Sequence, residues 1–195
     1  VLPYVDIFLP SLDEILFMMG GSLRERGDTM QTSGSGMDYA LCADLSEALI
    51  EMGAAIVCLK LGESGLYLRS STDLDRIKNM GKGAPFKPYE WRARELMTPC
   101  YQVQAAGATG SGDCTIAGFL SGWIRELTPP QVMNMAAAVG ASSVEHKDAT
   151  SGVRTWEETI QRMKQGWPKR NHIAPGAGWR CDERNGSWAG PRENL

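Results

Sequence analysis

The chain has 195 residues, and 43% of them are hydrophobic, which is enough for one domain with a substantial buried core. Its 20 Lys and Arg residues and 23 Asp and Glu residues give a formal net charge of -3. This balance excludes the basic surface of a nucleic-acid-binding protein or of a protein that docks on anionic membranes. We therefore expect a small-molecule ligand, and neither a nucleic acid nor a membrane, as the partner.

The cysteine content and the apolar N-terminal segment bear on the cellular localisation of the protein. The 5 cysteines are odd in number and include no Cys-x-x-Cys pair, and there are only 2 histidines, which argues against a disulfide framework or a zinc site. The apolar run at 1–9 contains Asp6 and has no basic flank, so it fits neither a signal peptide nor a membrane span. We predict a cytoplasmic protein.

A short strand and a helix are predicted first. The strand at 5–9 ends at Pro10, and the apolar residues that follow have helical spacing up to the pair Gly20-Gly21, which is expected to end the helix. Ser11 and Glu14 fit a capping box, in which each side chain accepts a hydrogen bond from the backbone N–H of the other residue. This interpretation gives Glu14 a structural task.

The next segment alternates helix and strand. A helix at 41–52 is followed by a strand at 55–59, and a glycine-containing turn at 60–65 leads to a strand at 66–69. This alternation, with strands that are apolar almost throughout, predicts an α/β protein with a doubly wound, mainly parallel sheet and helices on both faces. Residues 70–100 contain several Gly and Pro residues and show no clear period.

A glycine-rich turn at 106–112 separates a predicted short strand at 101–104 from a helix that begins at about Gly112. Backbone N–H groups at a helix start have no partner within the helix, and a phosphate can approach them closely where Cβ atoms are missing. The turn therefore predicts an anion site formed by the amides of Thr109, Gly110, Ser111 and Gly112.

Asp113 directly follows this anion site, although a carboxylate repels phosphate. One interpretation is a base that takes a proton from a substrate hydroxyl while the amides stabilise the transferring phosphoryl group. The other is a first-turn residue that stabilises the helix dipole in an ordinary glycine-rich turn. Neither the P-loop pattern nor the dinucleotide pattern G-x-G-x-x-G is present.

Two further helices complete the predicted core. One begins at Thr128, a cap followed by two prolines, and runs to about Val144 with small residues at its centre. The other begins with a capping box at Thr155. The composition then shifts to Gly, Pro, Trp and Arg without a period. We expect a core over 1–165 and an irregular strap over 166–195 that wraps it.

The stretch Ala-Thr-Gly-Ser-Gly-Asp at 108–113, with Ile-Ala-Gly-Phe at 116–119, resembles the C-terminal signature of the ribokinase-like (PfkB-type) carbohydrate kinases. In that family the glycine turn is the anion hole and the Asp that closes it is the catalytic base, which implies these roles for 109–112 and for Asp113. The family has an acidic or Asn residue where Gly107 stands, and in several members it helps to hold a monovalent cation. The resemblance implies ATP and Mg2+ as cofactors and leaves dependence on a monovalent cation open.

The resemblance also covers positions around the nucleotide. Gly62 and Gly65 match a Gly-x-x-Gly turn at the edge of the nucleotide site, which places Lys60 near a phosphate; a solvated lysine beside an ordinary glycine hairpin is the alternative. Ser11 and Glu14 fall in a Pro-Asn-x-x-Glu motif in which Ser11 replaces the Asn. This match implies that Glu14 helps to organise the magnesium and phosphate region, in addition to capping its helix.

The small-residue helix and the loop at 147–153 correspond to the wall of the family's adenine pocket, which implies nucleotide contacts for Ala137 and Ala141; tight helix packing is the alternative. The resemblance covers roughly 5–165 and only the later part of the family's chain. The fold is therefore expected to lack the N-terminal strands and the lid that supply most sugar contacts. The sheet edge left unpaired in this way predicts self-association, as a homodimer.

The function implied by the resemblance is that of an ATP-dependent carbohydrate kinase, which transfers a phosphoryl group from ATP to a hydroxyl of a small sugar. The chain corresponds to the C-terminal portion of such an enzyme, and the resemblance leaves open whether this portion is active alone. Two other interpretations stay open. One is a non-catalytic nucleotide-binding or interaction module of the same fold, and the other is a phosphate-binding domain of another doubly wound type.

Overall fold

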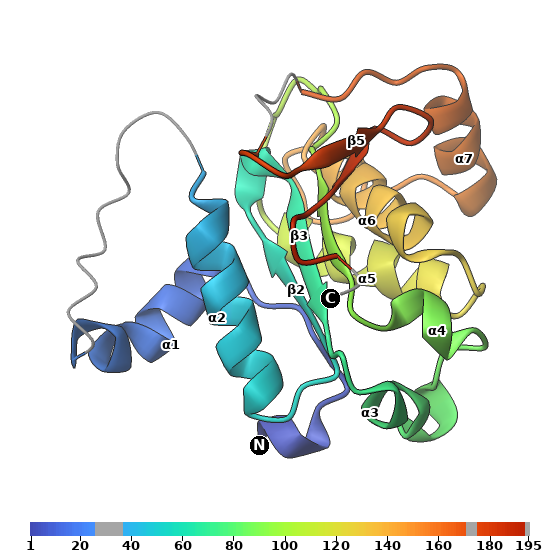
Figure 1. Cartoon of the computed structure of the whole chain (residues 1–195). Coiled ribbons are helices and arrows are strands. Elements are labelled where there is room, and N and C mark those ends of the chain that lie inside the picture. The colour runs from blue at the N-terminus through green and yellow to red at the C-terminus, as the bar shows by residue number, and fades with distance from the viewer. Residues whose placement is uncertain (26–36, 171–174, 194–195) are drawn as a thin grey trace.

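The structure, a computed structural model, describes residues 1–25, 37–170 and 175–193, and for residues 20–25 it describes the backbone alone. In these ranges a six-stranded sheet with the order β1-β2-β3-β4-β6-β5 lies between helices (Figure 1). Its strands are β1 (Ile7–Phe8), β2 (Ile56–Lys60), β3 (Leu66–Ser70), β4 (Glu95–Thr98), β5 (Arg180–Asp182) and β6 (Ser187–Ala189).

Helices cover both faces of this sheet. α2 (Tyr39–Glu51) lies on one face, where the first part of α1 (Leu12–Glu25) joins its core, and α5 (Ser111–Trp123) and α6 (Pro129–Ser143) lie on the other (Figure 1). The shorter elements are α3 (Leu74–Lys78), α4 (Pro88–Trp91), α7 (Trp156–Lys164) and the 3-10 turns η1 (Leu2–Tyr4), η2 (Gly62–Ser64) and η3 (Gly81–Gly83). Within the described ranges, no helix combines the length and the apolar composition that crossing a bilayer requires.

The pairing of the strands differs from the prediction. The α/β class and the helices on both faces are confirmed, but a mainly parallel sheet is wrong. β1 pairs with β2 in parallel, whereas all other pairings of the described strands are antiparallel. The turn at 61–65 between β2 and β3 is too short for the crossover that parallel neighbours need, so it forms a hairpin. A buried apolar strand has the same residue pattern whether it pairs in parallel or antiparallel. The sequence pattern therefore could not predict the antiparallel pairing.

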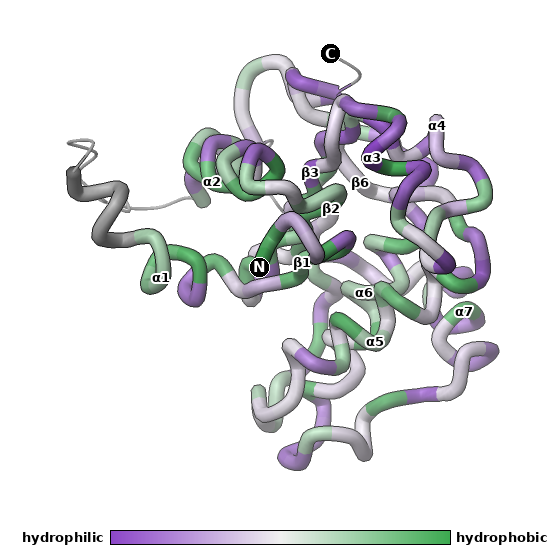
Figure 2. The backbone as a smooth tube through the Cα atoms, turned by 90° about the horizontal axis from the view of Figure 1, so that it is seen from below, coloured by the Kyte–Doolittle hydropathy of each residue, from purple (hydrophilic) through white to green (hydrophobic). Residues whose placement is uncertain are grey.

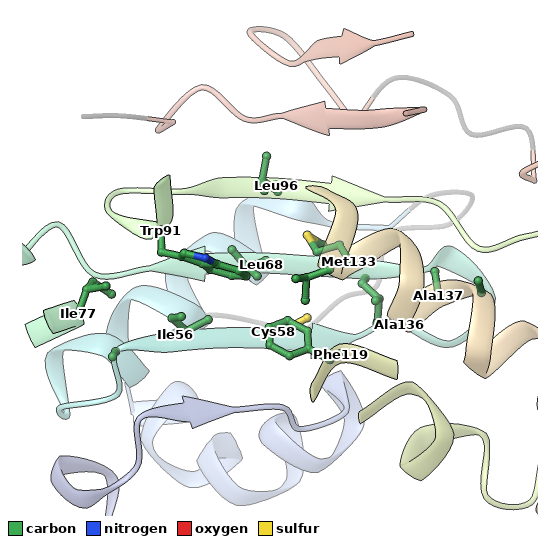
Figure 3. Close-up of a cluster of buried hydrophobic side chains, with 14 of the residues drawn as sticks. Ile56, Cys58, Leu68, Ile77, Trp91, Leu96, Phe119, Met133, Ala136 and Ala137 are labelled. Carbon is green, nitrogen blue, oxygen red and sulfur yellow. The ribbon is translucent and has the colours of Figure 1, made fainter. Parts of the chain in front are cut away.

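β2 carries both hydrophobic cores of the protein. Ile56 and Cys58 belong to the core that contains Phe119 and other residues of α5 and α6 (Figure 3). Val57 and Leu59 belong to the core formed with α1 and α2 on the opposite face. Alternate residues of one strand point to opposite faces, so burial on both sides fixes the register of β2. The end of β2 is thus held rigidly, and the candidate site begins there.

α1 extends away from the sheet, and part of its exposed surface is apolar. Figures 1 and 2 both show this helix projecting from the body of the protein. The side chains of Phe17 and Met18 are 89% and 61% exposed. β1 is the last strand at this end of the sheet, and no described strand pairs with its outer edge. An open sheet edge and exposed apolar residues each favour association, but the homodimer stays a prediction.

The local signals at helix ends are partly confirmed. The backbone N–H of Ser11 donates to Glu14 Oε2 at 2.6 Å, and that of Thr155 donates to Glu158 Oε2 at 2.9 Å, so both predicted capping boxes are present. The expected stop at Gly20-Gly21 is wrong, because α1 continues through it. A glycine inside a helix costs only about 1 kcal/mol and does not by itself end the helix.

Two predictions about strands are wrong. The structure describes 101–104 and has no strand there; the segment before it forms β4, and Tyr101 makes an isolated antiparallel bridge to Lys169. The tail at 166–195 was expected to be irregular, yet it contains the hairpin of β5 and β6, and β6 pairs with β4. The tail therefore extends the sheet, while the division of the chain after residue 165 stays a prediction.

α5 and α6 pack closely at Gly118. A Cβ atom added there would lie 2.9 Å from Ala136 Cα and from Val139 Cβ. We expect Gly118→Ala to lower the free energy of unfolding by about 1–3 kcal/mol, because the added atom overpacks the interface. Gly122→Ala is the matched control, because its Cβ would lie 3.3 Å from Val132 Cα and the gain in helix propensity offsets the contact. Urea unfolding checks this, and equal losses for both variants would contradict it.

Candidate active site

The glycine-rich turn ends in α5, which begins at Ser111, close to the predicted start. Gly110 precedes it with φ of 75°, in the left-handed region, and a Cβ there would lie 2.6 Å from Ala149 Cβ. Both facts require glycine at this position. The backbone N–H groups of Gly112 and Asp113 have no acceptor among the described residues, as expected in the first turn of a helix. This end of α5 therefore offers free donors and the positive end of its dipole.

β2 and α1 bring charged side chains to the start of α5. Lys60 is the last residue of β2, and a Cβ on Gly112 would lie 3.3 Å from Lys60 Nζ. The backbone N–H of Lys60 donates to Pro10 O at 2.9 Å, and Ser11 forms a parallel bridge with Lys60, so α1 begins beside it. Hydrogen bonds from Ser11 and, to a smaller extent, the Lys60 charge hold the pKa of Glu14 below its usual range.

The end of β2 and the starts of α1 and α5 form a junction, and a cavity of about 600 Å³ opens beside it. The predicted site residues that line it are Lys60, Gly62, Gly65, Ser111, Gly112, Ala137 and Ala141. The structure adds lining residues from the segment after β4, from the helices and from the tail, which include Glu63, Cys100, Tyr101, Val103, Thr115, Gly140, Val144 and Arg170. The fold thus gathers residues from distant parts of the sequence around one space.

Small residues shape the walls of this cavity. Gly65 has φ of 99°, and a Cβ there would collide with the carbonyl oxygen of Thr98. Gly140 packs on α5 so closely that it leaves no room for a side chain. Ala137 and Ala141 are 5% and 2% exposed and lie one helical turn apart on α6, so they present only methyl groups. This wall is apolar and close to the backbone, which suits a flat aromatic ring.

Some predicted residues belong to the site region without lining the cavity. Thr109, Gly110 and Asp113 are part of the turn and of the first turn of α5, and the side chain of Asp113 is exposed. Glu14 also lies outside the cavity lining. The loop at 147–153 does not line the cavity as predicted; it packs against the glycine turn, where it contacts Gly110.

Gly107, where the sequence departs from the family pattern, is enclosed by backbone. A Cβ added at this position would lie 3.0 Å from Lys147 Cα and 3.2 Å from His146 O. An acidic or Asn side chain here would therefore have to displace the backbone of 146–147. This packing gives a structural reason for glycine at 107, and it leaves the dependence on a monovalent cation open.

The sequence analysis missed Arg170 and the segment that carries it. Arg170 lines the cavity, and its guanidinium forms an ion pair with Glu63 at 2.5 Å. The predicted irregular strap gave no reason to expect a site residue in the tail. No local pattern could have signalled it, because Arg170 reaches the cavity only through tertiary pairing with residues 100–102.

A comparison with protein families matches residues 1–156 to the pfkB family carbohydrate kinases. The chain belongs to this family. The matched region contains β2, the Gly62–Gly65 turn, the glycine-rich turn and Asp113, so the motif resemblance and the family match agree. A search of curated proteins finds no match.

Solved structures place this PfkB-family chain in the ribokinase-like fold. The ribokinase of Thermotoga maritima is 20% identical, with a TM-score of 0.59 over 84% of this chain and 43% of that chain. The ribokinase of Arabidopsis thaliana, complexed with ribose and ATP, is 18% identical, with a TM-score of 0.62 over 84% of this chain and 42% of that chain.

A third relative is the aminoimidazole riboside kinase of Salmonella enterica, complexed with aminoimidazole riboside and an ATP analogue. It is 19% identical, with a TM-score of 0.53 over 80% of this chain and 41% of that chain. At these identities the likeness establishes the fold, which confirms the predicted ribokinase-like class. The chain spans about two fifths of the length of these solved relatives.

The family implies magnesium, and the residues at the junction can be tested for it. In the part of the chain that the structure describes, no three His, Cys, Asp or Glu side chains form a metal-binding group. Glu14 Oε2 accepts the hydrogen bond from Ser11, while Oε1 has no partner among the described residues. Mg2+ in kinases keeps several waters and binds one or two carboxylates together with phosphate oxygens. One carboxylate beside an anion site fits an ion that is held chiefly by a nucleotide.

Proposed function

We propose that this chain carries the ATP-binding and catalytic part of a PfkB-family kinase that transfers the terminal phosphoryl group of ATP to a hydroxyl of a sugar or riboside. The observation that carries the proposal is the junction of Lys60 with the free N–H groups of α5 inside a cavity that also has an apolar wall. A phosphate chain and a flat base need these two environments in one cavity.

The phosphate-binding part rests on charge and on free donors. Of the four predicted amides, that of Ser111 donates to Ala108 O at 3.2 Å, whereas the N–H groups of Thr109, Gly110 and Gly112 have no acceptor among the described residues. We assign the free amides of Thr109, Gly110 and Gly112 to the anion hole, and Ser111 as the residue that joins them in the turn. The missing side chain of residue 112 leaves open the space in front of Lys60 Nζ. Positioned charge of this kind is the main source of catalysis in phosphoryl transfer.

The nucleoside part rests on the small-residue wall. Ala137 and Ala141 of α6 form a surface against which an adenine ring can lie, and Gly62 and Gly65 add no side chain where the turn after β2 lines the cavity. Gly65 also lets this turn approach the end of β4. We assign these four residues and Lys60 to nucleotide binding.

Asp113 is assigned as the catalytic base. Its carboxylate takes the proton of the acceptor hydroxyl, the hydroxyl oxygen forms a bond to the γ-phosphorus, and the bond from that phosphorus to the bridging oxygen breaks to leave ADP. The exposed side chain of Asp113 is open to an acceptor that approaches from outside the cavity. Magnesium, when bound, neutralises phosphate charge, and Glu14 is positioned to hold it through its free oxygen or through water.

The class of acceptor is suggested by two relatives. The Arabidopsis thaliana enzyme is complexed with ribose and the Salmonella enterica enzyme with aminoimidazole riboside, and the two compounds share the ribose unit. We propose a ribosyl compound or a related sugar as the acceptor.

The test is ADP release by the natural protein that carries this chain, with ATP, Mg2+ and a panel of pentoses, hexoses and ribosides. We expect ADP release that depends on at least one acceptor and a phosphorylated product of matching mass. Tight ATP binding without acceptor-dependent ADP release for the whole panel would contradict the kinase.

A non-catalytic nucleotide-binding module of the same fold is the second candidate. The observation that favours it is the position of Asp113, whose side chain does not line the cavity. This module would bind ATP with the same residues but would not catalyse phosphoryl transfer. Substitution of Asp113 would then have no effect on a reaction rate. The acceptor panel therefore separates the two candidates directly.

A further inference from the structure

The tail returns to the cavity along the segment that follows β4. The backbone N–H of Gln102 donates to Pro168 O at 2.8 Å, and the N–H of Arg170 donates to Cys100 O at 2.8 Å. These bonds are those of a short antiparallel pairing, and they place Arg170 beside the cavity. The segment 167–170 lies outside residues 1–156, which match the PfkB family.

Two neighbours of Arg170 anchor this segment to the core. The ring of Trp167 stacks on that of Tyr101, with centroids 4.5 Å apart. Lys169 Nζ donates to Asn134 Oδ1 on α6 and, at 3.2 Å, to Thr98 Oγ1 at the end of β4. The backbone of Arg170 is thus held on the same elements that form the walls of the cavity.

The head of the Arg170 side chain is held much more weakly than its backbone. Its ion pair with Glu63 joins side chains that are 48% and 82% exposed. Exposed ion pairs contribute only about 0–1 kcal/mol. Another anion can therefore replace the Glu63 carboxylate at little cost, while the backbone of Arg170 stays in place.

The charge of the cavity indicates which anion this would be. Among the described lining residues, Lys60 and Arg170 are the basic side chains and Glu63 is the acidic one. While Glu63 holds Arg170, one positive charge is left for the phosphate chain of a nucleoside triphosphate. A guanidinium binds phosphate oxygens through two N–H groups in a fork, which is stronger and more specific than a single contact.

From this geometry we propose that Arg170 binds the phosphate chain of the nucleotide and that the phosphate displaces Glu63 from the ion pair. The inference rests on the proposed function and adds to it a tail residue that sets the preference for a charged nucleotide. Glu63 opposes binding in two ways, because it occupies Arg170 and its own charge repels phosphate.

Calorimetric titration of the chain with ATP–Mg2+, tripolyphosphate and adenosine tests the proposal. We expect Arg170→Ala to weaken ATP and tripolyphosphate binding about 10-fold and to leave adenosine affinity within about two-fold. Arg170→Lys is expected to fall between, because it keeps the charge without the fork. Arg184→Ala is the control, because Arg184 is 91% exposed and pairs with Asp182 in the tail hairpin.

Glu63→Gln is an independent test, because it is expected to change the ATP affinity in the opposite direction from Arg170→Ala. We expect it to strengthen ATP binding about three-fold, and we expect this gain to vanish in the double variant with Arg170→Ala, since the two residues act through one ion pair. Equal ATP affinities for Arg170→Ala and Arg184→Ala would overturn the role of Arg170 and leave the nucleotide site standing. If the unsubstituted chain bound neither ATP nor tripolyphosphate, the nucleotide site itself would fall, and this inference with it.

Discussion

Replacing Asp113 by Asn is expected to slow phosphoryl transfer about 10³-fold in the natural protein that carries this chain, because the acceptor hydroxyl loses its base. The affinity for ATP should change less than about three-fold, because Asp113 does not line the cavity and its amide N–H is kept. Steady-state kinetics with the best acceptor of the panel and a separate ATP titration measure the two effects.

Glu157→Gln is the matched control for this substitution. Glu157 is a carboxylate in the first turn of α7, as Asp113 is in the first turn of α5, and both side chains are exposed. If Asp113 only stabilised its helix, both variants would lose up to about 1 kcal/mol of stability and neither would lose turnover. Equal turnover of the two variants would therefore exclude Asp113 as the base.

Replacing Lys169 by Met is expected to lower the free energy of unfolding by about 2–4 kcal/mol at pH 9. Besides Thr98 and Asn134, the carbonyl oxygens of Asn185 and Gly186 lie 3.0 Å from Lys169 Nζ, so its N–H groups are shared among four acceptors. These bonds tie the tail hairpin to the core, and the substitution leaves buried acceptors without this donor.

The pH dependence of stability separates Lys169 from an ordinary surface lysine. Burial lowers the pKa of Lys169 to about 8, from an ordinary value of 10.5. Between these values the folded state binds fewer protons than the unfolded state, so the contribution of Lys169 to stability rises with pH, by up to about 1.4 kcal/mol per pH unit. Below pH 8 both states are protonated, and the contribution is constant and smallest.

Urea unfolding at pH 7 and pH 9.5 measures this contribution. We expect the stability difference between the unsubstituted chain and Lys169→Met to be larger at pH 9.5. Lys164→Met is the control, because Lys164 is exposed at the end of α7, and its effect should stay within about 0.5 kcal/mol at both pH values. If the stability difference between the unsubstituted chain and Lys169→Met did not increase with pH, the lowered pKa of Lys169 in the folded state would be contradicted.

The parts of the fold that were predicted correctly are those that local chemistry encodes. The capping boxes at Ser11 and Thr155, and the start of α5 after its glycine turn, depend on residues within a few positions of one another. The direction of strand pairing depends instead on connection lengths and tertiary packing. The same limit hid the hairpin in the tail, whose short strands pair with β4 across the fold.

The candidate site divides in the same way. The family resemblance implied Lys60 and Gly62, the glycine-rich turn itself indicated Gly112, and the structure gathers all three around one cavity. Arg170 and Glu63 form their ion pair across more than 100 positions of sequence, and no pattern along the chain encodes such a contact. The loop at 147–153 was misplaced for the same reason, because its packing against Gly110 is a tertiary contact.

The central claim, that the start of α5 and Lys60 form a nucleotide phosphate site, is tested most directly by calorimetric titration with ATP–Mg2+ of the chain and of Gly112→Val. A side chain at 112 would stand 3.3 Å from Lys60 Nζ and block the free amides. Gly83→Val is the control, because no atom lies within 4 Å of its added Cβ and Gly83 is not a cavity residue. We predict that Gly112→Val weakens ATP binding about 30-fold or more while Gly83→Val leaves it unchanged. Unchanged ATP affinity in Gly112→Val, or no ATP binding by the unsubstituted chain, would contradict the claim.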